Sequence, residues 1–330
     1  MTTDERTRVL PRLPRLSRRL GILRGRADTR VRATWRILVP LALWISVFAA
    51  LSAIVARVPG IDAVPREITG TAAYLGALGV TLAVSARLLD HRPVRAYGFD
   101  LDRRWWLDLA GGLAIGVVTQ GLLKGTYLAL GWARVSAVAS PGTGTASFAL
   151  GIALTLVLMV GVGVWEETLL RGVFITNAVE GLGSRVDSPA VAVLGAWLAS
   201  SAVFGALHLD AAGGMEMAVP VYLLSTAMSG LYFGLAYVLT DSLAFPIGLH
   251  VATNFAAVSL FGRATPTGRE FATLVRFERE FTGIWVALDG LNLLYATSLL
   301  LAVVAWVSVT RGSVSVSDSL LEAASGDDRR

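Results

Sequence analysis

Long apolar runs recur along this 330-residue chain and constrain its fold more than any other feature. A helix needs roughly twenty apolar residues to cross the hydrocarbon core of a bilayer. Only helices and closed barrels satisfy their backbone hydrogen bonds in lipid. The sequence therefore predicts an all-α polytopic bundle of about eight transmembrane helices. The runs lie at 35–56, 69–89, 105–131, 146–179, 189–209, 218–239, 242–261 and 283–309.

Composition and charge agree with a membrane protein. Hydrophobic residues make up 54% of the chain and charged residues 16%, which is unusual for a soluble core. Arginines gather in the segment before the first run and in the loop that follows the second run. The positive-inside rule then places both termini in the cytoplasm. The chain has no cysteine, which excludes disulfides, thiolate nucleophiles and zinc bound by cysteine.

The chain divides into five expected segments. The first is a basic cytoplasmic N-terminal tail at 1–34, and a basic tail beside a span favours an orientation or headgroup role over nucleic-acid binding. Helices one to three occupy 35–145, and a core of helices four to seven occupies 146–262. The segment 263–309 holds a loop, in which an interfacial amphipathic helix is one interpretation, and the last transmembrane helix. The Ser- and Asp-rich tail at 310–330 has no periodicity, and we expect it to be disordered.

The fourth run carries three charged residues, Glu166, Glu167 and Arg171. Each charge at the centre of a membrane helix costs roughly 2.5–3.5 kcal/mol, so the three need partners or a function. Glu167 and Arg171 are four residues apart, so they meet on one helix face and neutralise each other. Glu166 then remains available for chemistry. The alternative interpretation is a salt-bridged turn near one membrane surface.

Three more polar residues lie in or beside later runs: His208 in the fifth, and His250 with Asn254 in the seventh. In lipid such groups face the bundle interior or a water-filled cavity. A carboxylate or imidazole can take a proton from water there, while His and Asn donors stabilise an oxyanion. The same set offers a divalent metal, such as zinc, ligands from Glu166, His208 and His250. The plainer alternatives are an interfacial histidine and an interhelical hydrogen-bond pair.

These residues fall in three motifs that appear in a fixed order. "EETLLR" at 166–171 fits E-E-x-x-x-R, "FGALH" at 204–208 fits F-x-x-x-H, and "HVATN" at 250–254 fits H-x-x-x-N. With all three on membrane spans, the chain resembles the CPBP family of intramembrane proteases. This family is also called Abi or CAAX-protease-like, and it includes type II CAAX endopeptidases. The resemblance covers about 146–260, and "YGFD" at 97–100 is similar to a short element that often precedes the core.

The resemblance implies a role for each motif residue. Glu166 with His208 would activate the attacking water, His250 with Asn254 would stabilise the tetrahedral intermediate, and Glu167 with Arg171 would support the site. The implied activity is cleavage of a membrane-embedded or lipid-bearing protein or peptide in a prokaryotic cell membrane. A glutamate-type step without a certain cofactor and a metalloprotease with a divalent metal both remain open.

Two other functions compete with proteolysis. The chain could be a non-catalytic membrane scaffold or immunity protein that keeps the family fold. It could also be a proton-coupled transporter that uses the buried acids. A transporter of this kind often shows an inverted repeat between its halves, and no such repeat is visible in the sequence.

Overall fold

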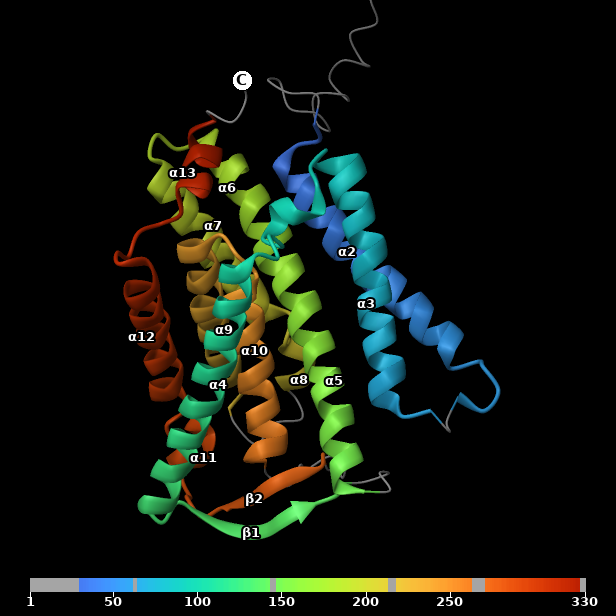
Figure 1. Cartoon of the computed structure of the whole chain (residues 1–330), viewed down its shortest axis with the longest axis vertical. Helices are drawn as coiled ribbons and strands as arrows, with labels where there is room; N and C mark the ends of the chain where they lie inside the picture. Colours follow the sequence, from blue (N-terminus) through green and yellow to red (C-terminus); the bar gives the residue numbers. More distant parts are fainter. Residues whose placement is uncertain (1–29, 62–63, 143–146, 213–217, 263–270, 327–330) are drawn as a thin grey trace, which may run out of the picture.

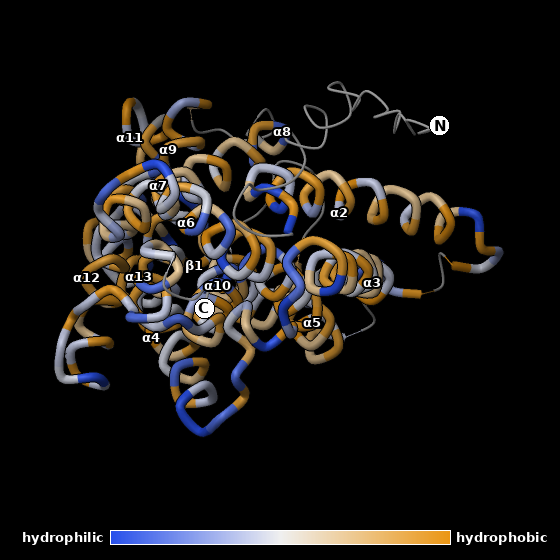
Figure 2. Tube along the Cα trace, turned by 90° about the horizontal axis from the view of Figure 1, so that it is seen from above, coloured by the Kyte–Doolittle hydropathy of each residue, from blue (hydrophilic) through white to orange (hydrophobic). Residues whose placement is uncertain are grey.

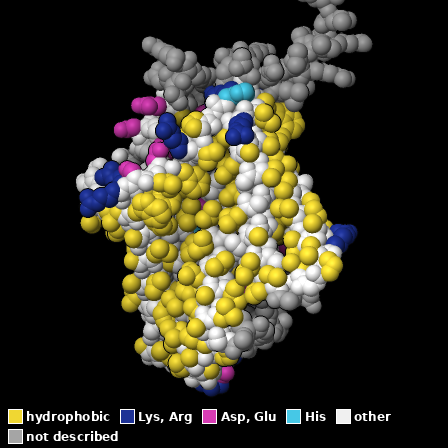
Figure 3. Space-filling model, turned by 45° about the vertical axis from the view of Figure 1, so that its right-hand side comes forward, with side chains coloured by type: hydrophobic (Ala, Val, Ile, Leu, Met, Phe, Trp, Pro, Cys, Tyr) yellow, Lys and Arg dark blue, Asp and Glu magenta, His cyan; other side chains and the backbone are white. Residues whose placement is uncertain are grey.

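The computed structural model describes residues 30–61, 64–142, 147–212, 218–262 and 271–326. Most of the basic N-terminal tail lies outside these residues. Within them, seven helices are long and apolar enough to cross a membrane. Figure 3 shows one face of the molecule covered largely by hydrophobic side chains. The predicted all-α polytopic bundle is confirmed.

The first two long helices form a pair at one side of the bundle (Figure 1). They are α2 (Ala33–Val55) and α3 (Arg66–Val84), which continues as a π-helical turn, η2 (Ser85–Leu89). Trp44 of α2 stacks on Trp165 of α5 with ring centroids 3.7 Å apart. Beyond that contact α2 projects away from the bundle, as the view from above shows (Figure 2).

The predicted fourth run is a 36-residue continuous helical rod with three parts. It begins as α5 (Phe148–Glu167), continues as the π-helical segment η4 (Thr168–Ile175) and ends as α6 (Thr176–Gly183). At about 1.5 Å per residue the rod is longer than a bilayer core. The sequence predicted its length and did not predict the π-helix. A π-helix inside an α-helix is rare and often marks a functional site.

The centre of the bundle is a short helix, α10 (Ala244–Phe255), extended by the π-helical turn η5 (Ala256–Leu260). It packs on α4 so closely that a Cβ at Gly112 would lie 2.5 Å from the carbonyl oxygen of Phe245. Small residues permit such close approach between membrane helices. The other helices around it are α4 (Arg103–Ala129), α7 (Pro189–Ala206), the short α8 (Leu209–Ala212) and α9 (Val219–Thr240).

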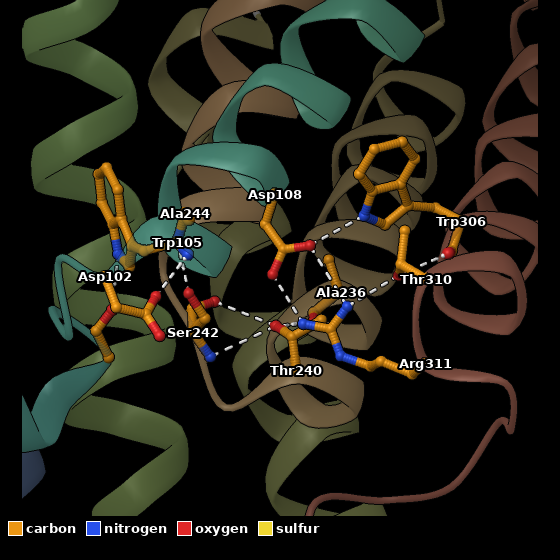
Figure 4. A network of polar contacts seen from close by, with 11 residues as sticks. Asp102, Trp105, Asp108, Ala236, Thr240, Ser242, Ala244, Trp306, Thr310 and Arg311 are labelled. Carbon is orange, nitrogen blue, oxygen red and sulfur yellow. Dashed lines mark hydrogen bonds and ion pairs between the residues drawn. The ribbon is translucent and has the colours of Figure 1, made fainter.

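The predicted eighth run is not one helix, and this prediction is corrected. The chain forms α11 (Ile284–Leu288) and then α12 (Asn292–Arg311). Asp289 and Gly290 between them have φ angles of 52° and 63°, in the left-handed region that a helix cannot include. A carboxylate on α4 holds the far end of α12, since Asp108 accepts from Arg311 Nη2 at 2.7 Å and from Trp306 Nε1 at 2.9 Å (Figure 4).

A two-stranded antiparallel sheet lies at the end of the bundle opposite the described termini (Figure 1). Strand β1 (Ala133–Ser140) pairs with β2 (Thr273–Arg279) from Ala133 opposite Arg279 to Ser140 opposite Thr273. The amphipathic-helix interpretation of this loop is therefore wrong. The alternating "TLVRFER" instead suits a strand, and its charges pair across the sheet, with Arg134 bound to Glu278 and Glu280.

The segment after Arg311 is also corrected, because it contains a helix, α13 (Asp318–Ser325), where we expected disorder. Ser317 caps this helix by accepting from the backbone N–H of Leu320. Leu320 and Ala324 are buried, and α13 packs on α6. Leu321 and Ala323, which are partly buried, also pack against the core, so apolar contacts dock this short helix. The described chain begins and ends at the same end of the bundle (Figure 1).

Candidate active site

The glutamate pair stands at the end of α5, where η4 begins. Glu167 is fully buried and Glu166 is 9% exposed. Glu167 Oε2 lies 3.1 Å from Arg171 Nε, so the ion pair predicted from their spacing is present. Both side chains of this pair are 0% exposed, so the pair does not lie on the surface of the protein. The charges instead lie inside the protein.

Aromatic rings enclose the guanidinium of Arg171. Its central carbon lies 4.7 Å from the ring centroid of Phe204 and 5.6 Å from that of Phe233. Arg171 Nη2 also donates to the carbonyl oxygen of Gly230 at 3.2 Å. Cation–π contacts and an ion pair offset part of the cost of burying this cation. Arg171 thereby joins η4 to α7 and α9.

The imidazole of His250 lies between the two carboxylates. Its Nδ1 is 2.6 Å from Glu167 Oε1, and its Nε2 is 4.0 Å from Glu166 Oε2. His250 is 3% exposed. Glu167 thus contacts both Arg171 and His250, whereas the sequence assigned it to Arg171 alone. The contact to His250 joins α5 to α10, and helical spacing cannot show a contact between two helices.

His208 and Asn254 occupy the edge of this group and are half-buried. His208 Nδ1 lies 2.8 Å from the carbonyl oxygen of Phe204, which leaves Nε2 as the nitrogen directed away from its own helix. The ring centroid of Phe204 lies 4.8 Å from that of His208 and 6.0 Å from that of His250. The side chain of Asn254 makes no hydrogen bond to any residue that the structure describes. Asn254 lies one helical turn after His250, as predicted.

The sequence missed one residue of the site, Phe233 on α9. Its ring stacks on the imidazole of His250, with centroids 4.5 Å apart and planes 11° apart. The surrounding "GLYFG" at 230–234 fits the small-xxx-small spacing that is typical of packed membrane helices, and such packing is present. A Cβ at Gly230 would lie 2.7 Å from Ser201 Cα, and one at Gly234 would lie 2.5 Å from Trp197 Cδ1. The aromatic residue between two packing glycines was the available signal.

The predicted metal ligands do not form a metal-binding group. No cluster of three or more His, Asp or Glu side chains in the described part of the chain is arranged to hold an ion. The Nδ1 atoms of His250 and His208 are engaged by Glu167 and by a backbone carbonyl. The geometry of Glu166, His208 and His250 therefore does not support the metalloprotease prediction. The arrangement instead places the carboxylates of Glu166 and Glu167 on either side of the His250 imidazole.

Comparison with known proteins bears on the core of the bundle. The family described as type II CAAX prenyl endopeptidase Rce1-like matches residues 147–256. No curated protein and no solved structure matches the chain. The matched segment begins at the start of α5, ends with α10 and includes all three motifs. It supports a CAAX-type endopeptidase in general terms. The predicted resemblance is thus confirmed: residues 147–256, about a third of the chain, are similar to the Rce1-like family of type II CAAX prenyl endopeptidases.

Proposed function

We propose that this protein is an intramembrane endopeptidase that hydrolyses a peptide bond with a water activated by Glu166 and His208. The observation that carries the proposal is the position of His250 between the carboxylates of Glu166 and Glu167 inside the bundle. A buried acid beside imidazoles is expensive in a membrane and is usually retained for function. The family match supports the same reaction class.

In the proposed step, Glu166 takes a proton from a water molecule while the water oxygen attacks the scissile carbonyl carbon. His208 would orient that water through Nε2. The carbonyl oxygen then carries a negative charge, which the Nδ2 amide of Asn254 and the Nε2 side of His250 would stabilise. Glu166 returns its proton to the leaving nitrogen as the C–N bond breaks. One carboxyl group thus serves as base and then as acid.

Glu167 and Arg171 have positioning roles in this proposal. Glu167 accepts from His250 Nδ1, which fixes the ring orientation and supplies the counter-charge when His250 is an imidazolium. Arg171 binds the other carboxylate oxygen and so holds Glu167 in place. The proposed step runs through Glu166 and uses no metal, because the described residues offer no three-ligand group.

We further propose that the substrate is a membrane-embedded or lipid-bearing protein or peptide, because the site lies within a bundle of membrane-spanning length. Both chain ends would face the cytoplasm. The support for this orientation is the exposed arginines on the loop between α3 and α4, which lies at the same end of the bundle as the described termini (Figure 1).

The test uses the full-length protein in proteoliposomes with membrane-anchored, quenched-fluorescent peptides, some of them carrying an isoprenyl chain. We expect Glu166→Gln and His208→Ala to abolish cleavage, while Glu322→Gln on the exposed face of α13 leaves it unchanged. Retained cleavage in both site variants would sink the mechanism. If the wild type cleaves no peptide but carries an acid-dependent proton flux across the same vesicles, the transporter function is favoured. Absence of both would favour the scaffold.

A further inference from the structure

The loop between α3 and α4 carries a cluster of exposed cations. We call residues 87–104 the cationic loop. None of its five exposed basic side chains forms an ion pair with a residue that the structure describes. The cluster consists of Arg87, His91, Arg95, Arg103 and Arg104.

The loop also exposes large apolar side chains among these cations. Leu88 is 64% exposed, Leu101 60% and Trp106, just beyond the loop, 56%. The loop begins in the last turn of one membrane-spanning helix and ends in the first turn of the next. Apolar and cationic side chains alternating at the end of a span suit the boundary between acyl chains and headgroups. A phospholipid can contact these apolar side chains with its acyl chains, whereas a soluble phosphate cannot.

The opposite end of the bundle uses its arginines differently. Arg134 binds Glu278 and Glu280, and Arg279 Nη1 lies 2.8 Å from Asp289 Oδ1. Arg134 and Arg279 of the sheet are therefore each paired with an acid. In Figure 3, Lys, Arg and His side chains gather toward the upper end of the face shown. The five exposed cations of the cationic loop thus differ from these sheet arginines, since none of the five has an ion-pair partner among the described residues.

We propose that the cationic loop binds the headgroups of anionic phospholipids. Clusters of Lys and Arg beside a membrane span attract acidic lipids, with about 1 kcal/mol for each cation near the surface. The exposed acids within the loop are Asp100 and Asp102, and Asp102 is engaged as the N-cap of α4. Positive charge therefore dominates the surface that faces the headgroups.

A buried polar network fixes the loop in place. The carboxylate of Asp90 accepts from the hydroxyl of Tyr97 and from Asn177 Nδ2 of α6. Burial and the neighbouring Asp90 carboxylate raise the pKa of Tyr97, so its phenol remains the donor. A loop that is ordered before binding loses less entropy when headgroups bind.

The same loop contacts Leu243, which directly precedes the His250 helix α10, and closely approaches η4, which continues the helix that carries the glutamates. Gly98 has a φ angle of 101°, and its carbonyl oxygen accepts from the backbone N–H of Leu243, just before α10, at 3.0 Å. A Cβ at Gly172 of η4 would lie 2.8 Å from the carbonyl oxygen of Tyr97. Headgroup binding that stabilises this loop would therefore stabilise the relative position of η4 and α10. This coupling rests on the proposed function, whereas the lipid binding does not.

Lipid binding is tested with the full-length protein in nanodiscs of phosphatidylcholine, with or without phosphatidylglycerol. The test variant combines Arg95→Gln with Arg104→Gln, and the matched control combines Arg57→Gln with Arg66→Gln, two exposed cations elsewhere. Native mass spectrometry counts retained phosphatidylglycerol, and thermal unfolding reports stabilisation. We expect the test variant to lose about 25-fold in lipid affinity, since two cations contribute roughly fivefold each. We expect the control to retain the wild-type affinity.

Equal losses in both variants, or no preference for phosphatidylglycerol in the wild type, would overturn the proposal. Glycerol phosphate added in solution should produce no stabilisation, and stabilisation by it would assign the site to soluble phosphate.

The cleavage rate tests the coupling separately. We expect phosphatidylglycerol to raise the rate of the wild type and the control and to leave the test variant unchanged. Lipid binding without any cleavage would retain the lipid site and reject the proposed function.

Discussion

The phenyl ring of Phe233 lies parallel to the imidazole of His250, with their centroids 4.5 Å apart. Such a contact limits rotation of the imidazole about its own side-chain bonds, and aromatic pairs contribute about 0.5–1.5 kcal/mol beyond the area that they bury. We expect Phe233→Leu to lower kcat about three- to tenfold with little change in KM, because the ring positions a group in the transition state.

The aromatic variant and a distant phenylalanine separate positioning from stability. Phe233→Tyr should restore most of kcat. Phe281→Leu removes a similarly buried ring from the cluster near the sheet and should lower thermal stability without changing kcat. A kcat loss in Phe281→Leu that equals the loss in Phe233→Leu would show that stability alone explains the effect.

Glu167 holds two buried partners, so its removal leaves Arg171 uncompensated. We expect Glu167→Leu to destabilise the fold by about 3–5 kcal/mol, the range for breaking a buried pair from one side. Adding Arg171→Met should recover much of that loss, because a well-packed apolar pair can replace a buried ion pair. Unfolding in a mild detergent measures both effects. If the two losses simply add, the pair is not coupled. Activity should not return in the double variant, since His250 remains without its partner.

Asp241 ends α9 with a φ angle of 50°, lies outside the membrane-spanning segments and accepts a hydrogen bond from Ser319 in α13. Burial raises the pKa of its carboxyl above the ordinary value, as does the neighbouring Asp100. The folded state then binds more protons than the unfolded state, so this group's contribution to stability falls as pH rises from the ordinary value through the raised pKa.

Asp241→Asn should therefore stabilise the protein near neutral pH and flatten this part of its stability profile, because asparagine also tolerates a left-handed conformation. Thermal unfolding across the acidic range is the measurement. Asp187→Asn replaces an exposed acid and should leave the profile as it is in the wild type. An unchanged profile in the Asp241→Asn variant would contradict the prediction.

Two glycines of α4 offer a matched test of close helix packing. A Cβ at Gly112 would lie 2.5 Å from the carbonyl oxygen of Phe245, whereas a Cβ at Gly125 meets nothing within 4 Å. We expect Gly112→Ala to destabilise the fold by about 1–3 kcal/mol through overpacking and to reduce activity by moving α10. Gly125→Ala should be neutral or slightly stabilising, because alanine favours a helix. Equal stability of the two variants would refute the tight α4–α10 contact.

The sequence predicted the parts of this molecule that depend on local composition. Apolar length located the spans, and four-residue spacing predicted the pairing of Glu167 with Arg171. It did not predict the left-handed break at Asp289, because an apolar run hides a change in backbone direction. Strand β2 and helix α13 were missed because each is stabilised by a distant partner, β1 in one case and α6 in the other.

In the site too, the sequence predicted local features and did not predict contacts between distant segments. The motif order predicted the candidate residues, but the contact of Glu167 with His250 and the stacking of Phe233 depend on how three helices pack. A single sequence contains no record of that packing. Hydropathy and spacing therefore identified the chemical groups and left the partners of each group unassigned.

The π-helical segment η4 has a consequence for how this chain tolerates changes in its length. Deleting one residue between Thr168 and Ile175 would favour an ordinary α-helix and would remove the wide turn that sets how Arg171 and α6 lie relative to the glutamates. Arg171 or the docking face of α6 would then turn away from its present neighbours. Related chains that keep this site should therefore accept insertions and deletions in their loops long before they accept one in this stretch.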